Sequence, residues 1–370
     1  MVVDSDTPDE SSEHTAPAVE SDQPANRNGW RRWRPSYLLV PLFILLIAAG
    51  VLEILPANVY ILLPGEALPV APMIAVPGHP AILKRGQLLL TDVSLYKANH
   101  KLEELWGRLN SSADVQPAAN VAGGLSDKQF LRLNLSMMDD SIHQAEAAAL
   151  NQIPGDHPRF AATGPRIVFV QPGTPASKLI HSGDVILAVN GRRVHRAAGV
   201  APLVRNLVPG KTVQLQLLRK GRPLLVSAKT VPANRVDPQA NPRTALIGIS
   251  LQDQIVFPVK IKINPGNIGG PSAGLMFSLG VIQRLEKQDI THGCRIAGTG
   301  TIDFYGTVGA IGGAKQKIIA ARSAGARYFL VPDVAENRDP AEANRGEITV
   351  VPVKTLPQAL RYLKTIKPCR

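Results

Sequence analysis

An apolar stretch of nineteen residues near the N-terminus, Tyr37–Leu55, constrains this chain more than any other feature. As an α-helix it is long enough to span the hydrocarbon core of a bilayer, which is about 30 Å thick. A buried core helix and a cleaved signal peptide are the alternatives. Signal segments are shorter, about 7–15 residues, and no clear small-residue cleavage site follows this stretch. We therefore predict a transmembrane helix over residues 37–55 that is retained as an anchor in the cell membrane.

The charges on either side of this stretch predict its orientation. No lysine or arginine follows it until Lys84, whereas four arginines precede it: Arg27, Arg31, Arg32 and Arg34. Since basic residues flanking a membrane span stay on the cytoplasmic side, residues 1–36 are expected inside and residues 56–370 outside the cytoplasm. Residues 1–29 hold seven acidic residues against one basic residue and are rich in serine and proline. This composition predicts that residues 1–36 form a disordered acidic tail.

Composition argues against several classes of function. The net charge is +12, but aromatic residues make up only 5% of the chain and no nucleic-acid recognition motif is present, so we predict no nucleic-acid partner. Two cysteines, Cys294 and Cys369, are too few for a disulfide-dense scaffold or a four-cysteine zinc site. They are either two separate thiols or one disulfide. The eight histidines form no metal-binding motif, so neither a metal nor another cofactor is predicted.

Residues 56–158 are predicted to form a β-rich extracytoplasmic region. Short apolar runs alternate there with proline and glycine, which is typical of strands and turns. A helix is expected from about Ser141 to Ile153, with Asp139 and Asp140 as its cap. We find no chemistry in this region, and His143 is interpreted as a helix-surface residue.

Residues 159–232 have the pattern of a small peptide-binding domain. A strand from Gly164 is followed by the turn Pro-Gly-Thr-Pro-Ala, a second strand after Gly183-Asp184, and Asn-Gly at a hairpin. This pattern resembles the PDZ domains that are fused to extracytoplasmic proteases. The resemblance implies a groove that binds an extended peptide, with Gly164, Pro165 and Ile167 as candidate peptide-binding residues and the helical residues 200–204 along the groove. A spacer domain without a ligand is the alternative.

The stretch of residues 231–242 contains three prolines, so residues 233–243 are predicted to be a linker, after which residues 244–370 form the last domain. Its strongest signal is Gly-Gly-Pro-Ser-Ala-Gly at 269–274, followed by an apolar helix. A serine at a glycine turn and a helix N-terminus is accessible to a substrate backbone and lies near free N–H groups that can bind an oxyanion. Alone, Ser272 could equally be a helix cap.

A second motif supplies a base for Ser272. On the helix that begins near Ala314, Lys317 lies on the apolar face, whereas Lys315 lies with Arg322 on the polar face. A lysine surrounded by apolar groups loses solvation, and its pKa falls toward neutrality. The neutral amine can then accept the serine proton, so Lys317 is the candidate base.

The two motifs together, over roughly 244–366, resemble the proteolytic domain of the Lon family, whose catalytic dyad is a serine and a lysine. The resemblance implies that Thr299 lies near the dyad lysine, that Gly270 and Pro271 support the nucleophile, and that the N–H of Ser272 and of a neighbouring glycine bind the oxyanion. Many Lon proteins have an acidic residue where Gly269 stands. No phosphate-binding motif of an ATPase is present, since Gly210-Lys211-Thr212 has Arg205 in place of the first glycine. The architecture therefore resembles the ATP-independent, membrane-anchored PDZ–Lon peptidases of bacteria, and a homo-oligomer is a further expectation.

We predict an α+β chain with an N-terminal transmembrane helix, a β-rich region, a PDZ domain and a Lon-type proteolytic domain. The expected activity is ATP-independent serine endopeptidase cleavage of extracytoplasmic proteins or peptides, with the PDZ domain binding or positioning the substrate. The alternative is a catalytically idle membrane scaffold that binds peptides.

Overall fold

The computed structural model describes residues 36–80, 86–155 and 157–369. The acidic tail predicted over residues 1–36 lies outside these ranges, except for its last residue. Helix α1 (Ser36–Ile54) forms over the apolar stretch, and its large side chains are exposed, with Phe43 65% accessible. Within the described part of the chain, no helix meets the length and hydropathy needed to cross a membrane. The predicted membrane anchor is thus not confirmed.

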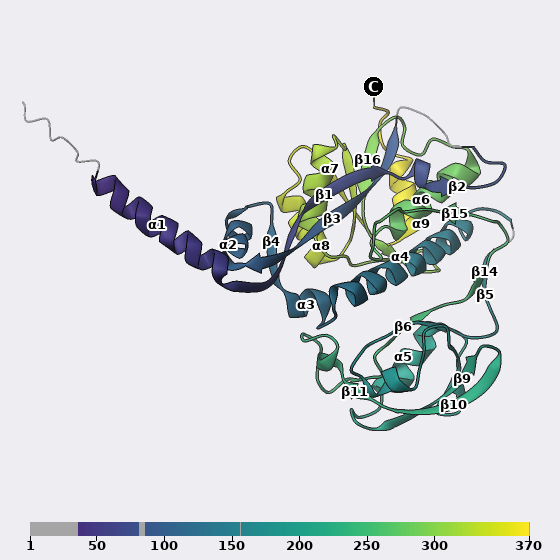
Figure 1. Cartoon of the computed structure of the whole chain (residues 1–370). Helices are drawn as coiled ribbons and strands as arrows, with labels where there is room; N and C mark the ends of the chain where they lie inside the picture. The colour runs from purple at the N-terminus through teal and green to yellow at the C-terminus, as the bar shows by residue number, and fades with distance from the viewer. Residues whose placement is uncertain (1–35, 81–85, 156, 370) are drawn as a thin grey trace, which may run out of the picture. The chain divides into compact units, whose positions relative to one another are not determined.

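One six-stranded sheet combines strands from two distant stretches of the chain (Figure 1). In spatial order they are β4 (Asp114–Pro117), β1 (Pro56–Pro69), β3 (Gln87–His100), β16 (Arg295–Gly298), β19 (Tyr328–Pro332) and β20 (Thr349–Val353). The last four run parallel, whereas β1 is antiparallel to both of its neighbours.

Helices cover both faces of this sheet. Side chains alternate along a strand, so Leu88 and Leu90 of β3 pack on one face while Leu89 packs on the other. The first face is covered by α4 (Asp127–Leu150), α6 (Gly274–Glu286) and α9 (Leu356–Leu363), and the second by α7 (Ala314–Ser323) and α8 (Ala335–Ala343). Helix α6 is buried almost throughout, and its sequence is apolar from Gly274 to Ile282 except for Ser278. This part of the chain is a mixed α/β fold.

The region 56–158 is not a separate β-rich domain. Its strand β3 pairs in parallel with β16, about two hundred positions later, so residues 56–158 complete the predicted proteolytic domain. The helix expected at Ser141–Ile153 begins earlier, at Asp127, behind a capping box formed by Ser126 and Gln129. The sequence could not reveal the partner of β3, because an apolar run predicts a buried strand but not its neighbours.

A second sheet forms the predicted PDZ domain. In spatial order its strands are β10 (Arg222–Lys229), β9 (Thr212–Arg219), β7 (Val185–Val189), β6 (Arg166–Val170) and β13 (Ile249–Gln252), with β8 (Arg192–Arg193) beside β7. Strand β9 buries every second side chain against the domain core. Helix α5 (Ala197–Arg205) also packs on this core through Val200 and Val204.

The boundary of this domain lies later than predicted. The linker of residues 233–243 is followed not by the proteolytic domain but by β13, which is the edge strand of the PDZ sheet. The remaining short elements are α2 (Lys101–Leu109), α3 (Ala118–Ala122), the bridging strands β2 (Ile74–Ala75), β5 (Arg159–Phe160), β11 (Val231–Pro232), β12 (Ala245–Leu246), β14 (Ile255–Val256), β15 (Lys262–Ile263), β17 (Thr301–Ile302) and β18 (Val308–Gly309), and the 3-10 turns at Ala71–Met73, Pro175–Lys178 and Ala233–Arg235.

Candidate active site

The loop that carries Ser272 is held by helix α4. Gly270, whose φ of +86° favours glycine, donates its N–H to the carbonyl oxygen of Asn134 at 2.9 Å. The hydroxyl of Ser141, two turns further along α4, donates to the carbonyl oxygen of Pro271, also at 2.9 Å. Two backbone groups next to the nucleophile are therefore fixed by an element that the sequence did not associate with catalysis.

Thr299 connects the nucleophile loop to strand β16. Its hydroxyl donates to the carbonyl oxygen of Ser272 at 3.1 Å, and the N–H of Gly300 donates to the same oxygen at 2.9 Å. The side chain of Thr299 is completely buried. Thr299 thus orients the backbone of Ser272. This contact is additional to the contact with Lys317 that the family resemblance implied.

Lys317 reaches Ser272 from helix α7. Its Nζ atom lies 2.6 Å from the Oγ of Ser272 and 3.1 Å from the Oγ1 of Thr299. Only 3% of Lys317 is exposed. Burial lowers the pKa of Lys317 to about 7, and the negative charge of Asp92 opposes this shift. By contrast, Lys315 is only half-buried and directs its Nζ toward the carbonyl oxygen of Ala113 at 3.4 Å.

The dyad opens into a cleft of about 500 Å³. The residues that line it come from β1, β3, α4, the nucleophile loop and the segment before α7: Leu62, Leu90, Thr91, Asp92, Val93, Leu95, Asn134, Asn267, Ile268, Gly269, Pro271, Ser272, Ala273, Thr301, Ala310, Ile311, Gly312 and Lys317. Most of them are apolar or uncharged, and Asp92 is the one carboxylate among these described lining residues. The cleft can therefore accept an extended, largely apolar segment of polypeptide.

Position 269, where a glycine replaces the acidic residue of many Lon proteins, is crowded by helix α4. A Cβ atom at Gly269 would lie 3.0 Å from the Cβ of Asn134, which leaves little room for any side chain. The cleft receives its carboxylate from another element, because Asp92 lies on β3. Asp92 could not be recognised beforehand, since nothing in the sequence pattern around it links residue 92 to residue 317.

The expected oxyanion donors are only partly available. The N–H of Gly270 is engaged by Asn134, so that glycine cannot serve. Among the hydrogen bonds of the described residues, none uses the N–H of Ser272. This N–H group, next to the N-terminus of α6, is free to bind a developing negative charge.

The PDZ domain has a groove beside helix α5. A cavity of about 190 Å³ lies between α5 and the edge strand β13, lined by Phe169, Gln171, Val200, Ala201, Val204, Arg205, Val236, Leu246, Ile247, Gly248, Ile249 and Leu251. Val200 and Val204 were expected here. Gly164, Pro165 and Ile167 are instead buried outside the cavity, and β6 is already paired with β7 and β13. The cavity therefore does not include these three residues, and a peptide-binding role for them stays a prediction.

Two further features lie away from the dyad. Cys294 and Cys369 form a disulfide, which decides between the two alternatives for the cysteines.

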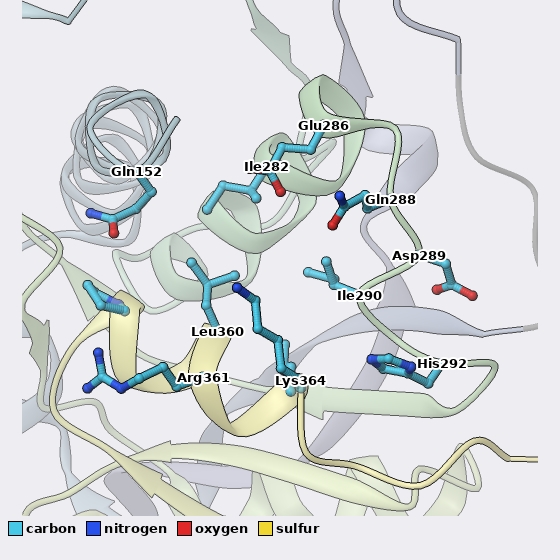
Figure 2. Close-up of a pocket in the computed structure, with 12 residues that line it drawn as sticks. Gln152, Ile282, Glu286, Gln288, Asp289, Ile290, His292, Leu360, Arg361 and Lys364 are labelled. Carbon is cyan, nitrogen blue, oxygen red and sulfur yellow. The ribbon is translucent and has the colours of Figure 1, made fainter. Parts of the chain in front are cut away.

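A cavity of about 460 Å³ lies at the C-terminal end of α6 and beside α9. Side chains of both charges surround it, including Glu286, Arg361 and Lys364 (Figure 2). None of the predicted site residues lines this second cavity.

Comparison with known proteins agrees with the two domains. Residues 251–365 match the Lon protease (S16) C-terminal proteolytic domain, and residues 135–230 match the PDZ domain. The Lon protease of Rickettsia bellii is 30% identical over 129 residues, which is 34% of this chain and 16% of the relative. The Lon protease of Xanthomonas oryzae is 38% identical over 96 residues, or 25% of this chain and 11% of the relative. The matches thus span only a small part of these relatives.

This chain is also similar to a solved structure, the PDZ domain of the SdrC-like protein from Listeria monocytogenes. The identity is 19% and the TM-score is 0.22. The match covers 25% of this chain and 92% of that structure. The sequence matches, rather than this likeness, carry the assignment. The chain contains a PDZ domain and a Lon-type proteolytic domain, and the latter supports a serine peptidase.

Proposed function

We propose that this chain is an ATP-independent serine endopeptidase that cleaves extracytoplasmic proteins or peptides with a dyad of Ser272 and Lys317. The observation that carries the proposal is the 2.6 Å separation of Lys317 Nζ from Ser272 Oγ, together with the burial that brings the pKa of Lys317 to about 7. At neutral pH a substantial fraction of Lys317 is then an uncharged amine in contact with the nucleophile.

The chemistry follows from this contact. Neutral Lys317 accepts the proton of Ser272 while Oγ attacks the scissile carbonyl carbon, and the free N–H of Ser272 binds the resulting oxyanion. The carbon–nitrogen bond then breaks, and the leaving amine takes the proton back from the Lys317 ammonium group. Water, deprotonated by Lys317, hydrolyses the acyl-enzyme, and Ser272 recovers its proton. Thr299 keeps the Lys317 amine directed at Ser272 through its 3.1 Å contact.

Three parts of the proposal rest on further observations. ATP independence is supported by the lack of a phosphate-binding motif in the sequence. An extracytoplasmic location and a membrane anchor are supported by the four arginines before Tyr37, by the exposed apolar side chains of α1, and by the disulfide, which persists in oxidising compartments. Assembly into a homo-oligomer is an expectation from the family resemblance alone.

The PDZ groove is proposed to bind substrate. Strand β13 has one unpaired edge facing α5, so an extended peptide can add to it by main-chain hydrogen bonds. The apolar lining, with Ile247 and Leu251, suits an apolar side chain of the peptide. This groove would hold a substrate while another segment enters the cleft at Ser272.

Cleavage of a quenched-fluorescent peptide by the purified full chain tests the proposal. Ser272→Ala and Lys317→Ala should each lower kcat/KM by on the order of a thousandfold or more, while the thermal unfolding profile shows that the fold is kept. Lys315→Ala, on the same helix, is the matched control and should change kcat/KM by less than about twofold, the effect expected of a side chain that does not touch the dyad. Added ATP should have no effect.

Two results would contradict the proposal. Cleavage by Ser272→Ala at a rate close to that of the unmodified chain would place the nucleophile elsewhere. Peptide binding by the unmodified chain, without any cleavage and without labelling of Ser272 by a serine-reactive probe, would favour the idle scaffold instead.

A further inference from the structure

One wall of the cleft is held by a residue that neither lines it nor belongs to the dyad. Asn337, on α8, accepts a hydrogen bond from the N–H of Ile311 at 2.9 Å and donates its Nδ2–H to the carbonyl oxygen of the same residue at 2.6 Å. The side chain is almost completely buried, with 2% exposed. A single carboxamide thus satisfies both backbone groups of one residue in the cleft wall.

This double contact determines how the neighbouring backbone is oriented. One carboxamide can reach the N–H and the C=O of a single residue only where both point to the same side, as they do in extended backbone. Each peptide group is planar and trans, so the C=O of the preceding residue and the N–H of the following residue point to the opposite side. Because Ile311 turns its N–H and C=O toward Asn337, the C=O of Ala310 and the N–H of Gly312 face away from that side chain.

The backbone groups of Ala310 and Gly312 are available to a ligand. Neither residue has a hydrogen-bond partner for its N–H or C=O among the described residues. Both residues are exposed and line the cleft beside Ser272, and no atom lies within 4 Å of the position that a Cβ on Gly312 would occupy. An extended chain can therefore approach this edge closely.

We propose that Ala310–Gly312 is a docking edge for the substrate backbone and that Asn337 is the positioning residue that holds this edge in shape. The inference rests on the proposed peptidase function and names its substrate class. The ligand is an extended, unfolded stretch of polypeptide, recognised through its main-chain N–H and C=O groups rather than through one particular side chain. A folded segment, whose main-chain groups are already paired, would not bind.

Binding of a non-cleaved peptide provides the test. The protein is the full chain carrying Ser272→Ala, and the probe is a fluorescein-labelled decapeptide of leucine and alanine whose amidated C-terminus removes any carboxylate recognition by the PDZ groove. Analogues carry an N-methyl group on one backbone amide at a time. Asn337→Asp keeps the acceptor for the N–H of Ile311 but removes the donor to its carbonyl oxygen. Asn344→Asp is the matched control, because its Nδ2 donates to Pro340 at the end of the same helix.

The expected results form a double-mutant cycle between protein and peptide. In the Ser272→Ala parent and in the Asn344→Asp control, N-methylation at one or two positions should raise Kd about three- to tenfold, the effect of one main-chain hydrogen bond. In Asn337→Asp the unmodified peptide should already bind about tenfold more weakly, and N-methylation should then cost less than about twofold. Equal costs of methylation in both proteins, or an unchanged Kd in Asn337→Asp, would overturn the inference.

A second variant tests the inference in case Asn337→Asp does not fold. If Asn337→Asp does not fold, Gly312→Val is used, because no protein atom lies within 4 Å of its Cβ position and the added side chain obstructs the docking edge. Binding should then weaken at least about tenfold, as expected when the hydrogen bonds of more than one main-chain group are lost, and unchanged binding would overturn the inference. Since these proteins lack the nucleophile, the outcome is independent of catalysis, which is read separately from labelling of Ser272 in the unmodified chain.

Discussion

In the proposed mechanism, the chemistry depends on Lys317, because burial of this side chain decides its protonation. A lysine in water is charged at neutral pH, whereas inside the protein the loss of hydration brings its pKa to about 7. Asp92 has the opposite effect on the pKa of Lys317, since its negative charge in the same cleft favours the charged ammonium form. The two residues together set the pH range in which the dyad is competent.

Replacing Asp92 should move that range. Asp92→Asn removes a charge that stabilises the Lys317 ammonium group, so the pKa of Lys317 should fall further, and the pH of half-maximal kcat/KM should shift to lower pH. The asparagine Oδ1 can still accept the hydrogen bond from the N–H of Glu66, which keeps the local fold. The measurement is the pH dependence of kcat/KM, with Asp114→Asn, on strand β4 outside the cleft, as control. A shift to higher pH would show that Asp92 does not act on Lys317 in this way.

Among individual residues, those whose role follows from a local sequence pattern could be predicted. Ser272 follows from a glycine turn before a helix, and Lys317 from its position on an apolar helical face. Asp92, Asn134, Ser141 and Asn337 could not be predicted, because each acts on residues far away in the chain. Their neighbours are created only when the sheet and its helices assemble.

Among the elements, strand β13 has the largest consequence for function. It begins directly after the run Leu246–Gly248, which reads in the sequence as the start of the proteolytic domain. The structure adds it to the PDZ sheet as an edge strand and so creates the groove beside α5. Edge strands offer unpaired backbone groups, which makes β13 suited to bind a peptide.

Filling the groove should abolish peptide binding there without disturbing the dyad. Ala201 lines the cavity and is half-buried, so Ala201→Phe should occupy it and raise the Kd of a peptide with a free C-terminal carboxylate and an apolar last residue by at least about tenfold, which corresponds to 1.4 kcal/mol. Ala198→Phe, exposed on the same helix, is the control and should bind normally. Fluorescence anisotropy gives both Kd values. Normal binding by Ala201→Phe would locate the peptide site elsewhere.

In the whole molecule, the proteolytic domain is discontinuous in sequence. Residues 56–150 and the residues after β13 build one sheet with a hydrophobic cluster on each face, and the PDZ domain is inserted between them. The sequence predicted both domain types correctly but placed the first stretch in a region of its own. Local patterns report strands and helices, whereas the parallel pairing of β3 with β16 depends on the completed fold.

The proposed orientation leads to a prediction for intact cells. Since basic residues mark the cytoplasmic side, protease added outside should digest the proteolytic domain and spare the acidic N-terminal tail. Immunoblotting against tags at the two ends provides the measurement, with a cytoplasmic protein as control. The disulfide of Cys294 and Cys369, 75 residues apart, should be oxidised in the same cells, and in the chain-entropy model it stabilises the fold by roughly 4 kcal/mol. Protection of the C-terminal tag until lysis would contradict the orientation.

The dyad itself is tested most directly by the rate at which a small serine-reactive probe acylates Ser272 as a function of pH. Because the folded-state pKa of Lys317 is lowered to about 7, the neutral amine increases as pH rises through 7. Mass spectrometry should therefore find the label on Ser272, with a rate that rises between about pH 5 and 9 and is half-maximal near pH 7. A rate that falls steadily over this range in folded protein, or a label on another residue, would contradict a Ser272–Lys317 dyad.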